Sequence, residues 1–356
     1  MLIQKKHFLT FIIIIFQKKE MKNNLIPLYK TPYKAPSWLP GGNAQTIYPY
    51  LVKPTTQPIT YRRERWELAD GDFIDLDWID GSANTPLVVI FHGLEGGSDS
   101  HYVLSTVNHF SKYDWRCVVI HFRGCSGIPN RLARAYHAGD SAEIDWMLKR
   151  VADQTQAQEN NQPIYAIGVS LGGNALLKWL GEQSENANKI LAGAAAISVP
   201  LDLAAAGAAL DSGFNRIYTR HFLNSLVYKA KEKLNQFPGL FDAKALTNCT
   251  SIYQFDNLVT APLHGFRNTD EYWHLSSSKQ WLTHIRIPTV VINALNDPFM
   301  PATALPGPQE AASAVTLEFP EEGGHAGFIH SPFPGKLDWL PQRIISFFHY
   351  DCTKKF

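Results

Sequence analysis

Cysteine is scarce in this sequence of 356 residues, which has only Cys117, Cys125, Cys249 and Cys352. The four form neither a CxxC pair nor a Cys/His spacing suited to zinc, so they predict no disulfide framework and no metal site. Free cysteine behaves as a small apolar residue. We therefore interpret these residues as buried or incidental thiols in a reducing compartment, and predict a cytoplasmic protein.

An excess of charge of one sign is also lacking. The formal net charge is +1, charged residues make up 18% of the chain, and no run of five or six like charges occurs. Such runs mark nucleic-acid-binding tails, so we expect no nucleic-acid partner. The 45% hydrophobic content is typical of a globular soluble protein with one large domain. We expect no cofactor, and the sequence carries no signal for the oligomeric state.

A long apolar run is missing as well, because a spanning helix needs about 20 apolar residues. The segment HFLTFIIIIF near the N-terminus is too short, and no small-residue cleavage site follows it. Met21 follows directly after QKKE, so we interpret residues 1–20 as a mis-called upstream start, a processing artefact or a disordered extension. The alternative is a weak interfacial anchor that gives peripheral membrane contact. The domain then covers residues 21–356, with an N-terminal arm at about 21–60.

The sequence does contain short apolar runs that end in turn residues. Such runs are typical of buried parallel strands. Five of them are PLVVIFHG from residue 86, RCVVIHF from 116, PIYAIGVS from 163, ILAGAAAISVP from 190 and IPTVVINALNDPF from 287. Segments with helical spacing lie between them, at 140–152 and 174–183. Strands that alternate with helices predict an α/β fold with a mostly parallel, doubly wound sheet.

The strand pattern stops between about residues 201 and 285, where the sequence becomes helical and aromatic. An insertion in an α/β core at this point predicts a helical cap over the carboxyl ends of the strands, where such sheets bind ligands. Tyr218, Phe222 and Leu226 could serve such a cap in two ways. They either face a ligand or simply pack in the interior of the insertion.

The segment from Gly168 to Gly172 reads G-x-S-x-G between a predicted strand and a predicted helix. This is the pattern of a nucleophile elbow, in which small residues permit a tight turn and the serine hydroxyl stands clear of the backbone. The helix N-terminus behind Ser170 would present free N–H groups to a developing negative charge. An ordinary helix cap is the alternative interpretation of this serine.

A serine nucleophile needs a histidine to take its proton, and in this fold the expected chain order is serine, acid, histidine. His325 fits best, because it follows the strand-like AVTLEFP inside the glycine-rich loop PEEGGHAGF. His330 lies close enough to remain an alternative. Among the other histidines, His92 and His121 precede the serine, and His264, His274 and His284 lie in the cap region.

The acid that orients the histidine should follow a late strand. Asp297 in VVINALNDPFMP meets this expectation, and Asp202 in AAISVPLDL is the runner-up. Acyl transfer also needs two N–H groups directed at the developing oxyanion. We expect these to be the backbone N–H of Leu171, directly after the serine, and that of Leu94 in the loop FHGLEGGSDSHY.

Together these blocks resemble the YheT-like branch of the α/β-hydrolase superfamily, which includes membrane-tethered eukaryotic relatives. The resemblance is carried by HGLEGGSDSHY, HFRGCSG with RLARAYHAGD, GVSLGGN, NALNDPF and GGHAGF, and extends from SWLPGGNAQTIYP to DWLPQRIISFF. It implies a Ser170, Asp297 and His325 triad and carboxylic ester hydrolysis. Arg123, Arg134 and Tyr136 fall in the same blocks, and their chemistry by itself indicates no role: they either hold the loop after HFRG against the floor of the site or contact the substrate.

The sequence therefore predicts a metal-free serine carboxylesterase that acts through an acyl-enzyme on a small-molecule ester. An aromatic cap favours short- or medium-chain acyl groups, with monoacylglycerols as a lipid candidate. Two alternatives remain: an acyltransferase with the same triad, and a catalytically silent binding protein that has kept the fold. Dehalogenation on the same fold normally needs an aspartate where this chain has Ser170.

Overall fold

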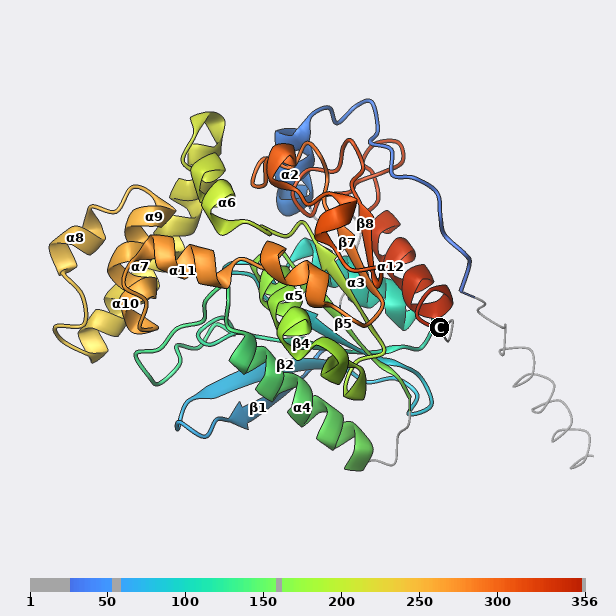
Figure 1. The fold of residues 1–356 in the computed structure, drawn as a ribbon, viewed down its shortest axis with the longest axis horizontal. Helices are drawn as coiled ribbons and strands as arrows, with labels where there is room; N and C mark the ends of the chain where they lie inside the picture. The colour runs from blue at the N-terminus through green and yellow to red at the C-terminus, as the bar shows by residue number, and fades with distance from the viewer. Residues whose placement is uncertain (1–25, 53–58, 158–161, 354–356) are drawn as a thin grey trace, which may run out of the picture.

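A computed structural model of the chain describes residues 26–52, 59–157 and 162–353 (Figure 1). The extension predicted at residues 1–20, together with its alternative as an anchor, lies outside the described residues. Within these three ranges, no helix has both the length and the apolar content needed to cross a membrane.

An eight-stranded sheet forms the centre of the molecule, in the order β1-β2-β4-β3-β5-β6-β7-β8. The strands are β1 (Arg62–Glu67), β2 (Phe73–Ile79), β3 (Leu87–Phe91), β4 (Arg116–Ile120), β5 (Ile164–Val169), β6 (Gly193–Ile197), β7 (Thr289–Ile292) and β8 (Val315–Glu318). The ladders β1–β2 and β2–β4 are antiparallel, and the other five are parallel. The predicted α/β class with a mostly parallel sheet is thus confirmed.

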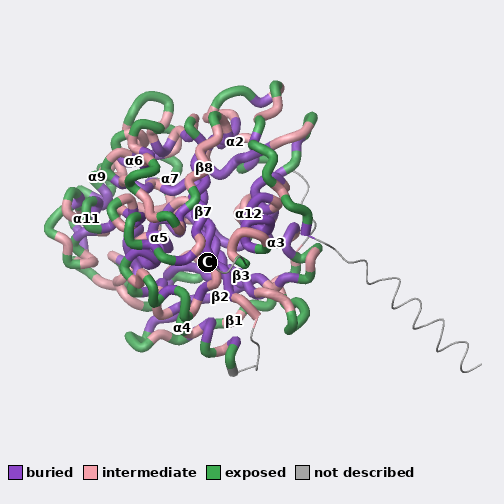
Figure 2. The backbone as a smooth tube through the Cα atoms, turned by 45° about the vertical axis from the view of Figure 1, so that its right-hand side comes forward, coloured by how far each residue is buried: buried purple, intermediate pink, exposed green. Residues whose placement is uncertain are grey.

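Helices cover both faces of this sheet, which is why its central strands are apolar throughout. On one face, α3 (His101–Ser111) and α12 (Trp339–Tyr350) pack against Val88 and Ile90 of β3. On the other, α4 (Ser141–Ala157) and α5 (Leu171–Gln183) pack against Val89 and Phe91. The alternating residues of one strand therefore enter two separate cores. Figure 2 shows the buried strands between their helical layers.

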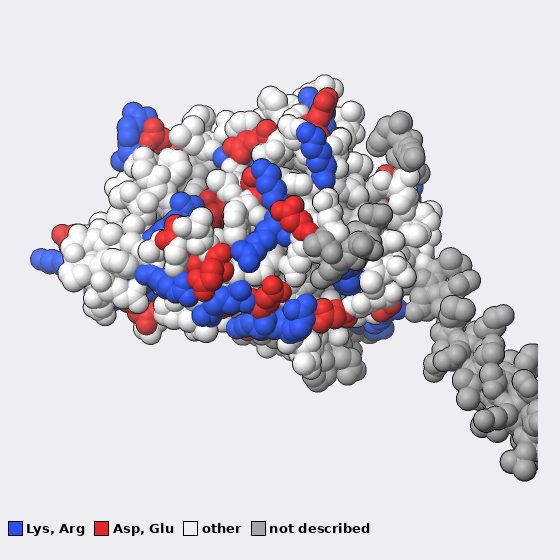
Figure 3. Space-filling view, turned by 90° about the horizontal axis from the view of Figure 1, so that it is seen from below, with Lys and Arg blue, Asp and Glu red and all other residues white. Residues whose placement is uncertain are grey.

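The edge strand β1 and its neighbour β2 were not predicted from the sequence. Most residues of β1 are charged, and its Arg63 and Arg65 stand directly opposite Asp77 and Asp75 of β2. Each arginine forms a bidentate ion pair with the aspartate opposite it, at N–O distances of 2.7–2.9 Å. Cross-strand charge pairs of this kind stabilise one face of an antiparallel ladder. On the other face, Ile74, Leu76 and Trp78 of β2 alternate with these aspartates and enter the core. Basic and acidic side chains are interspersed on the face shown in Figure 3.

The residues between β6 and β7 form a group of helices beside the sheet, at the left of Figure 1, and we call residues 201–285 the cap. Its α-helices are α6 (Leu203–Leu210), α7 (Arg216–Gln236), α8 (Ala243–Thr247), α9 (Ile252–Phe255), α10 (Ala261–Leu263) and α11 (Thr269–Ser276). A π-helical turn at Asp256–Thr260 joins α9 to α10. Leu223, Leu246 and Phe255 belong to a small apolar core within the cap.

The N-terminal arm runs over the C-terminal part of the domain before it enters α2 (Gly42–Val52). Tyr33 donates a hydrogen bond to the carbonyl oxygen of Ile329, and its ring packs edge-on against Phe328 and Trp339. The start of the described chain and its last third are therefore packed together, which brings α2 to the loops that follow β7 and β8.

Candidate active site

Ser170 occupies the turn between β5 and α5, directly after a fully buried strand. Its backbone lies at φ 53° and ψ −121°, an unusual conformation for a residue with a side chain. The Ser170 N–H donates to the carbonyl oxygen of Ile197 at 2.8 Å, which ties the turn to the end of β6. The strand, tight turn and helix expected of a nucleophile elbow are all present here.

Gly168 and Gly172 allow this turn because no side chain fits at either position. A Cβ added to Gly172 would lie 2.5 Å from the carbonyl oxygen of His92, and one added to Gly168 would lie 2.6 Å from the Cα of Gly173. Both distances are far below van der Waals contact, and the atoms approached belong to the backbone. The two glycines of the G-x-S-x-G pattern therefore serve close packing between β3, β5 and α5.

His325 and Asp297 come together from the loops after β8 and β7. The imidazole Nδ1 lies 2.9 Å from Asp297 Oδ2 and 3.2 Å from Oδ1, and the carboxylate is buried. Because Nδ1 faces the acid, Nε2 is the nitrogen left to accept a proton. The ring of Phe299 packs against the imidazole at a centroid distance of 4.1 Å.

Helix α2 supports the histidine loop, a relationship that the sequence analysis missed. The Thr46 hydroxyl accepts a hydrogen bond from the backbone N–H of His325 at 2.8 Å, and Gln45 Oε1 accepts one from that of Gly323 at 2.9 Å. Asn296 Oδ1 accepts one from Gly324 at 3.0 Å. These residues lie in the blocks quoted for the family resemblance, but local pattern gives no sign that α2 would reach residues almost 280 positions away.

The competing acid and base have other partners. Asp202 caps the N-terminus of α6, where its carboxylate accepts a hydrogen bond from the N–H of Ala205 at 3.0 Å. His330 Nε2 lies 2.5 Å from Asp338 Oδ1, outside the Asp297 pair. In the cap region, the ring of His264 contacts that of His137 at a centroid distance of 4.3 Å, with the two rings tilted by 50°. Among the histidines considered, the structure brings His325 to Asp297.

The loop after β3 lies beside the serine turn, and a Cβ added to Gly93 would lie 3.1 Å from that of Ser170. Most N–H groups of this loop are bonded within the protein: Gly93 to Tyr102, Glu95 to Tyr136, Gly96 to Gly93 and Gly97 to Ser100. Among the described residues, the N–H of Leu94 has no such acceptor. The N–H of Leu171 belongs to the first turn of α5, where helical N–H groups lack intrahelical partners.

His92 fixes the base of the same loop. Its Nε2 accepts a hydrogen bond from the N–H of Phe122 at 3.1 Å, so the ring proton is on Nδ1 and is donated to the carbonyl oxygen of Gly93 at 2.8 Å. Burial lowers the pKa of His92 to about 3, which keeps the imidazole neutral. His92, which directly follows β3, therefore has a structural role: it positions the loop after this strand.

Arg123, Arg134 and Tyr136 acquire partners in the structure. The buried Arg123 guanidinium pairs with Asp72 and Glu143, and Arg134 pairs with Asp140. The Tyr136 hydroxyl accepts a hydrogen bond from the N–H of Glu95 at 2.9 Å. Arg123 and Tyr136 line the same cavity as Ser170 and His325, and neither forms a hydrogen bond with Ser170 or His325 in the described part of the chain.

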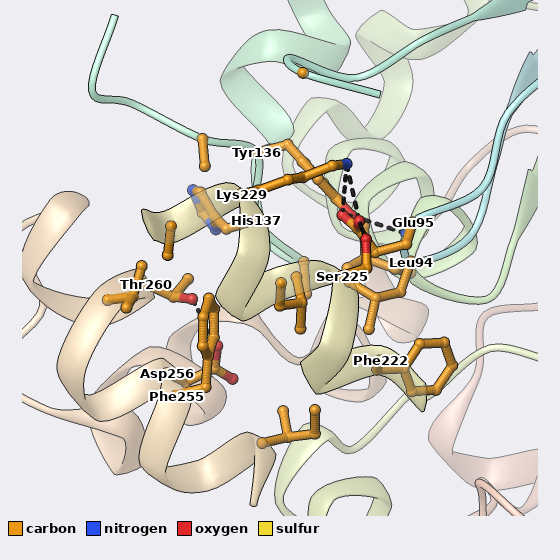
Figure 4. A pocket seen from close by; sticks show the side chains of 18 of the residues that line it. Leu94, Glu95, Tyr136, His137, Phe222, Ser225, Lys229, Phe255, Asp256 and Thr260 are labelled. Atoms are coloured by element: carbon orange, nitrogen blue, oxygen red, sulfur yellow. Dashed lines mark hydrogen bonds and ion pairs between the residues drawn. The ribbon is translucent and has the colours of Figure 1, made fainter. Parts of the chain in front are cut away.

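A cavity of about 600 Å³ joins these groups to the cap. Ser170, His325, Leu94 and Leu171 line it on the core side, although no hydrogen bond connects Ser170 to His325 in the described residues. Apolar cap side chains supply much of the opposite wall, and these include Leu203, Leu210, Phe222, Leu226, Phe255, Val259, Leu263 and Trp273. Figure 4 shows side chains that line it. The predicted cap residues Phe222 and Leu226 therefore face the cavity.

One carboxyl group stands out in the apolar cap wall. Asp256 is buried in the π-helical turn and accepts hydrogen bonds from the Thr260 hydroxyl at 2.6 Å and Trp273 Nε1 at 2.8 Å. Burial raises its pKa to about 6 against the opposing effect of these two donors. Within the described ranges, no cluster of three or more His, Cys, Asp or Glu residues is arranged to hold a metal ion.

Comparisons with known proteins agree with this architecture. A family model described as alpha/beta hydrolase fold matches residues 86–332. The protein named "Putative esterase YheT" from Escherichia coli (strain K12) is 37% identical over 306 residues, which cover 84% of this chain and 88% of that protein.

More distant relatives carry lipase names. "Phospholipase ABHD3" from Mus musculus is 28% identical, over 88% of this chain and 77% of that protein. "Monoacylglycerol lipase" from Saccharomyces cerevisiae is also 28% identical, over 85% of this chain and 68% of that protein. Among solved structures, the esterase Pf2001 from Pyrococcus furiosus has the same fold, with a TM-score of 0.52 and 15% identity over 83% of this chain and 96% of that one.

Proposed function

Because the chain belongs to the alpha/beta hydrolase family and is an ester hydrolase, we propose that it cleaves carboxylic esters with Ser170 as nucleophile, His325 as base and Asp297 as orienting acid. The observation that carries this proposal is the joint exposure of Ser170 and the Asp297-bound His325 to one cavity. Nδ1 of the imidazole is held by the carboxylate, so Nε2 is free to take the serine proton.

The reaction proceeds in two halves. His325 Nε2 takes the proton of the Ser170 hydroxyl while Oγ forms a bond to the ester carbonyl carbon. The oxyanion is stabilised by the N–H groups of Leu171 and Leu94, then collapses as the bond to the alkoxide breaks, and His325 returns the proton to the leaving alcohol. A water molecule repeats the sequence on the acyl-enzyme, which releases the carboxylic acid and restores Ser170.

Because the cap wall of the cavity is apolar, we propose that the cavity holds the acyl group of the substrate and that this group is apolar. A volume of about 600 Å³ is within the usual range for small-molecule sites. We propose short- or medium-chain esters, with monoacylglycerols as the lipid candidate. The names of the phospholipase and monoacylglycerol lipase relatives agree with a lipid acyl ester.

Covalent labelling with a fluorophosphonate, followed by intact mass, tests the nucleophile directly. We expect stoichiometric labelling of the wild type and of Ser212→Ala, which alters an exposed serine of the cap. Ser170→Ala should abolish labelling, and His325→Ala should slow it by several orders of magnitude. A folded wild type that does not label would contradict the proposal and favour a binding protein on the same fold.

A second assay separates hydrolysis from acyl transfer. p-Nitrophenyl butyrate is incubated with the protein at rising glycerol or methanol concentration, and free acid and new ester are measured by chromatography. Hydrolysis predicts that free acid remains the main product under dilute alcohol. A new ester that dominates at millimolar alcohol would identify an acyltransferase with the same triad.

A further inference from the structure

Glu95 links the loop after β3 to the cap, and it directly follows Leu94, whose N–H lacks an internal acceptor among the described residues. Lys229 Nζ of α7 lies 2.8 Å from Glu95 Oε2 and 3.0 Å from Oε1. Ser225, one helical turn earlier, donates its hydroxyl proton to Oε2. Because residues four apart share a helix face, a single surface of α7 holds both carboxylate oxygens.

The core holds Glu95 as well. The Tyr136 hydroxyl accepts a hydrogen bond from the Glu95 N–H and donates one to Oε1, both at 2.9 Å. Tyr136 is itself buried and stacks on Phe122 at the end of β4. Glu95 is therefore fixed by three side chains, two from the cap and one from the core, as Figure 4 shows.

The backbone at Glu95 needs such support. Its φ is +56°, in the left-handed region that favours glycine and is strained for residues with a Cβ. Glycines follow at positions 96 and 97, yet the residue in this conformation is a glutamate whose side chain is only 10% exposed. A strained conformation persists only where surrounding contacts determine it, and here the contacts are those of the Glu95 carboxylate.

The strained residue sets the geometry of the Leu94 N–H. The peptide groups on either side of Leu94 belong to a turn closed by the hydrogen bond from Gly96 N–H to Gly93 O at 3.0 Å. Release of Glu95 would let this turn relax, and the Leu94 N–H would change direction even if the elbow at Ser170 did not move. An oxyanion donor acts only when its N–H is directed at the position that the charged oxygen reaches.

We propose that Glu95 is a positioning residue that makes the oxyanion geometry of Leu94 depend on the seating of α7, through its contacts with Ser225 and Lys229. The inference rests on the proposed function, because it assigns Leu94 a part in the same reaction. In this proposal the cap has two functions. It forms one wall of the acyl cavity, and through Glu95 it holds the Leu94 N–H in the geometry needed for catalysis. Loss of the link should therefore lower kcat more than it raises KM, since the bound substrate has no oxyanion and the charge develops only as the tetrahedral intermediate forms.

The test compares Glu95→Gln and Lys229→Met with Lys231→Met, which removes an exposed lysine from the same helix. For p-nitrophenyl butyrate we expect kcat to fall by about 10- to 100-fold in the first two variants, with KM within about threefold of the wild type. The double variant should lose little more than either single one, because both changes break the same contact. Lys231→Met should match the wild type.

Glu95→Gly distinguishes positioning from simple support of the fold. Glycine removes the strain at φ +56°, so thermal unfolding should show a melting temperature no lower than that of Glu95→Gln. If the carboxylate positions Leu94, kcat of Glu95→Gly stays low despite this stability. Recovery of wild-type kcat in Glu95→Gly, or unchanged kcat in folded Glu95→Gln or Lys229→Met, would overturn the proposal.

Fluorophosphonate labelling of the same variants keeps this inference separate from the proposed function. The end-point stoichiometry at Ser170 should remain complete in Glu95→Gln, because the nucleophile and its base are intact, while the labelling rate falls. Absence of labelling in the folded wild type would instead refute the serine mechanism, and the role of Glu95 with it.

Discussion

Asp297 binds His325 through both carboxylate oxygens, at 2.9 and 3.2 Å from Nδ1. The same carboxylate accepts the N–H of Phe299 at 2.8 Å, and the Phe299 ring packs on the imidazole. The acid thus fixes both the tautomer and the orientation of the base, directly and through its neighbour in the loop.

Asp297→Asn should lower kcat by about 10³- to 10⁴-fold, because the amide favours the wrong imidazole tautomer and does not stabilise the imidazolium. Asp202→Asn is the matched control, since it makes the same chemical change in the competing acid. Asparagine caps helices as well as aspartate does, so this variant should keep its activity and stability. Steady-state hydrolysis of p-nitrophenyl butyrate measures both, and a larger loss in Asp202→Asn would assign the acid role to Asp202.

Gly172→Ala should destabilise the protein and reduce its activity. The added Cβ would lie 2.5 Å from the carbonyl oxygen of His92 and 2.6 Å from that of Phe91, so α5 must shift away from β3. We expect the free energy of unfolding to fall by about 1–3 kcal/mol in urea titrations. Gly307→Ala, where the added Cβ comes no closer than 3.8 Å to another residue, should change it by less than about 0.5 kcal/mol. Equal stability of the two variants would contradict the packing argument.

Asp256 should make stability depend on pH in the mildly acidic range. Burial raises the pKa of its carboxyl to about 6 in the folded protein, so the folded state binds more protons than the unfolded state between about pH 4 and 6. The contribution of this residue to the free energy of unfolding therefore falls as pH rises through that window and is constant above it.

Asp256→Asn should remove this slope and make the protein more stable than the wild type at pH 8 by about 1–2 kcal/mol. Urea unfolding at pH 4.5, 6 and 8 measures the effect, with Asp153→Asn on the exposed surface of α4 as the control. If the difference between Asp256→Asn and the wild type is the same at all three pH values, the raised pKa is wrong.

Leu263→Trp should shift the acyl preference towards short chains. Leu263 lines the cavity on the cap side, and a larger side chain there fills space that a longer acyl group would use. The kcat/KM ratio of octanoate to acetate p-nitrophenyl esters should fall by about tenfold or more, the effect of one or two displaced methylenes. Leu275→Trp, at an exposed position of α11, should leave the ratio unchanged. An unchanged ratio in Leu263→Trp would place the acyl group elsewhere.

Local pattern was sufficient to predict the parallel strands and the turn at Ser170. Buried strands are continuous apolar runs, and the elbow requires glycines at fixed spacing, so both leave a mark within a few residues. The pairing of Asp297 with His325 followed from chain order in this fold, which places both after late strands. The strands and the turn are features that a short stretch of sequence determines by itself, whereas this pairing also depends on the order of the elements in the fold.

Long-range contacts left no comparable mark. The strand β1 is charged because Asp75 and Asp77 of another strand neutralise its arginines, and this is visible only once the pairing is known. Thr46 holds His325 across 279 positions, and Lys229 holds Glu95 across 134. Nothing in the sequence distinguishes Thr46 from other helical threonines, or Lys229 from other lysines of the cap, until the contact with the partner residue is known.

The support of His325 by α2 has a consequence for how the protein is synthesised. The ribosome makes Thr46 and Gln45 almost 280 residues before the loop that they hold. Helix α12 follows still later, and its Trp339 packs on Phe328 of this loop. Early segments can begin to fold while the rest is being made. The base of the proposed triad, however, can reach its place only after residue 325 has been translated, so a nascent chain that stops before it would carry Ser170 without a working partner.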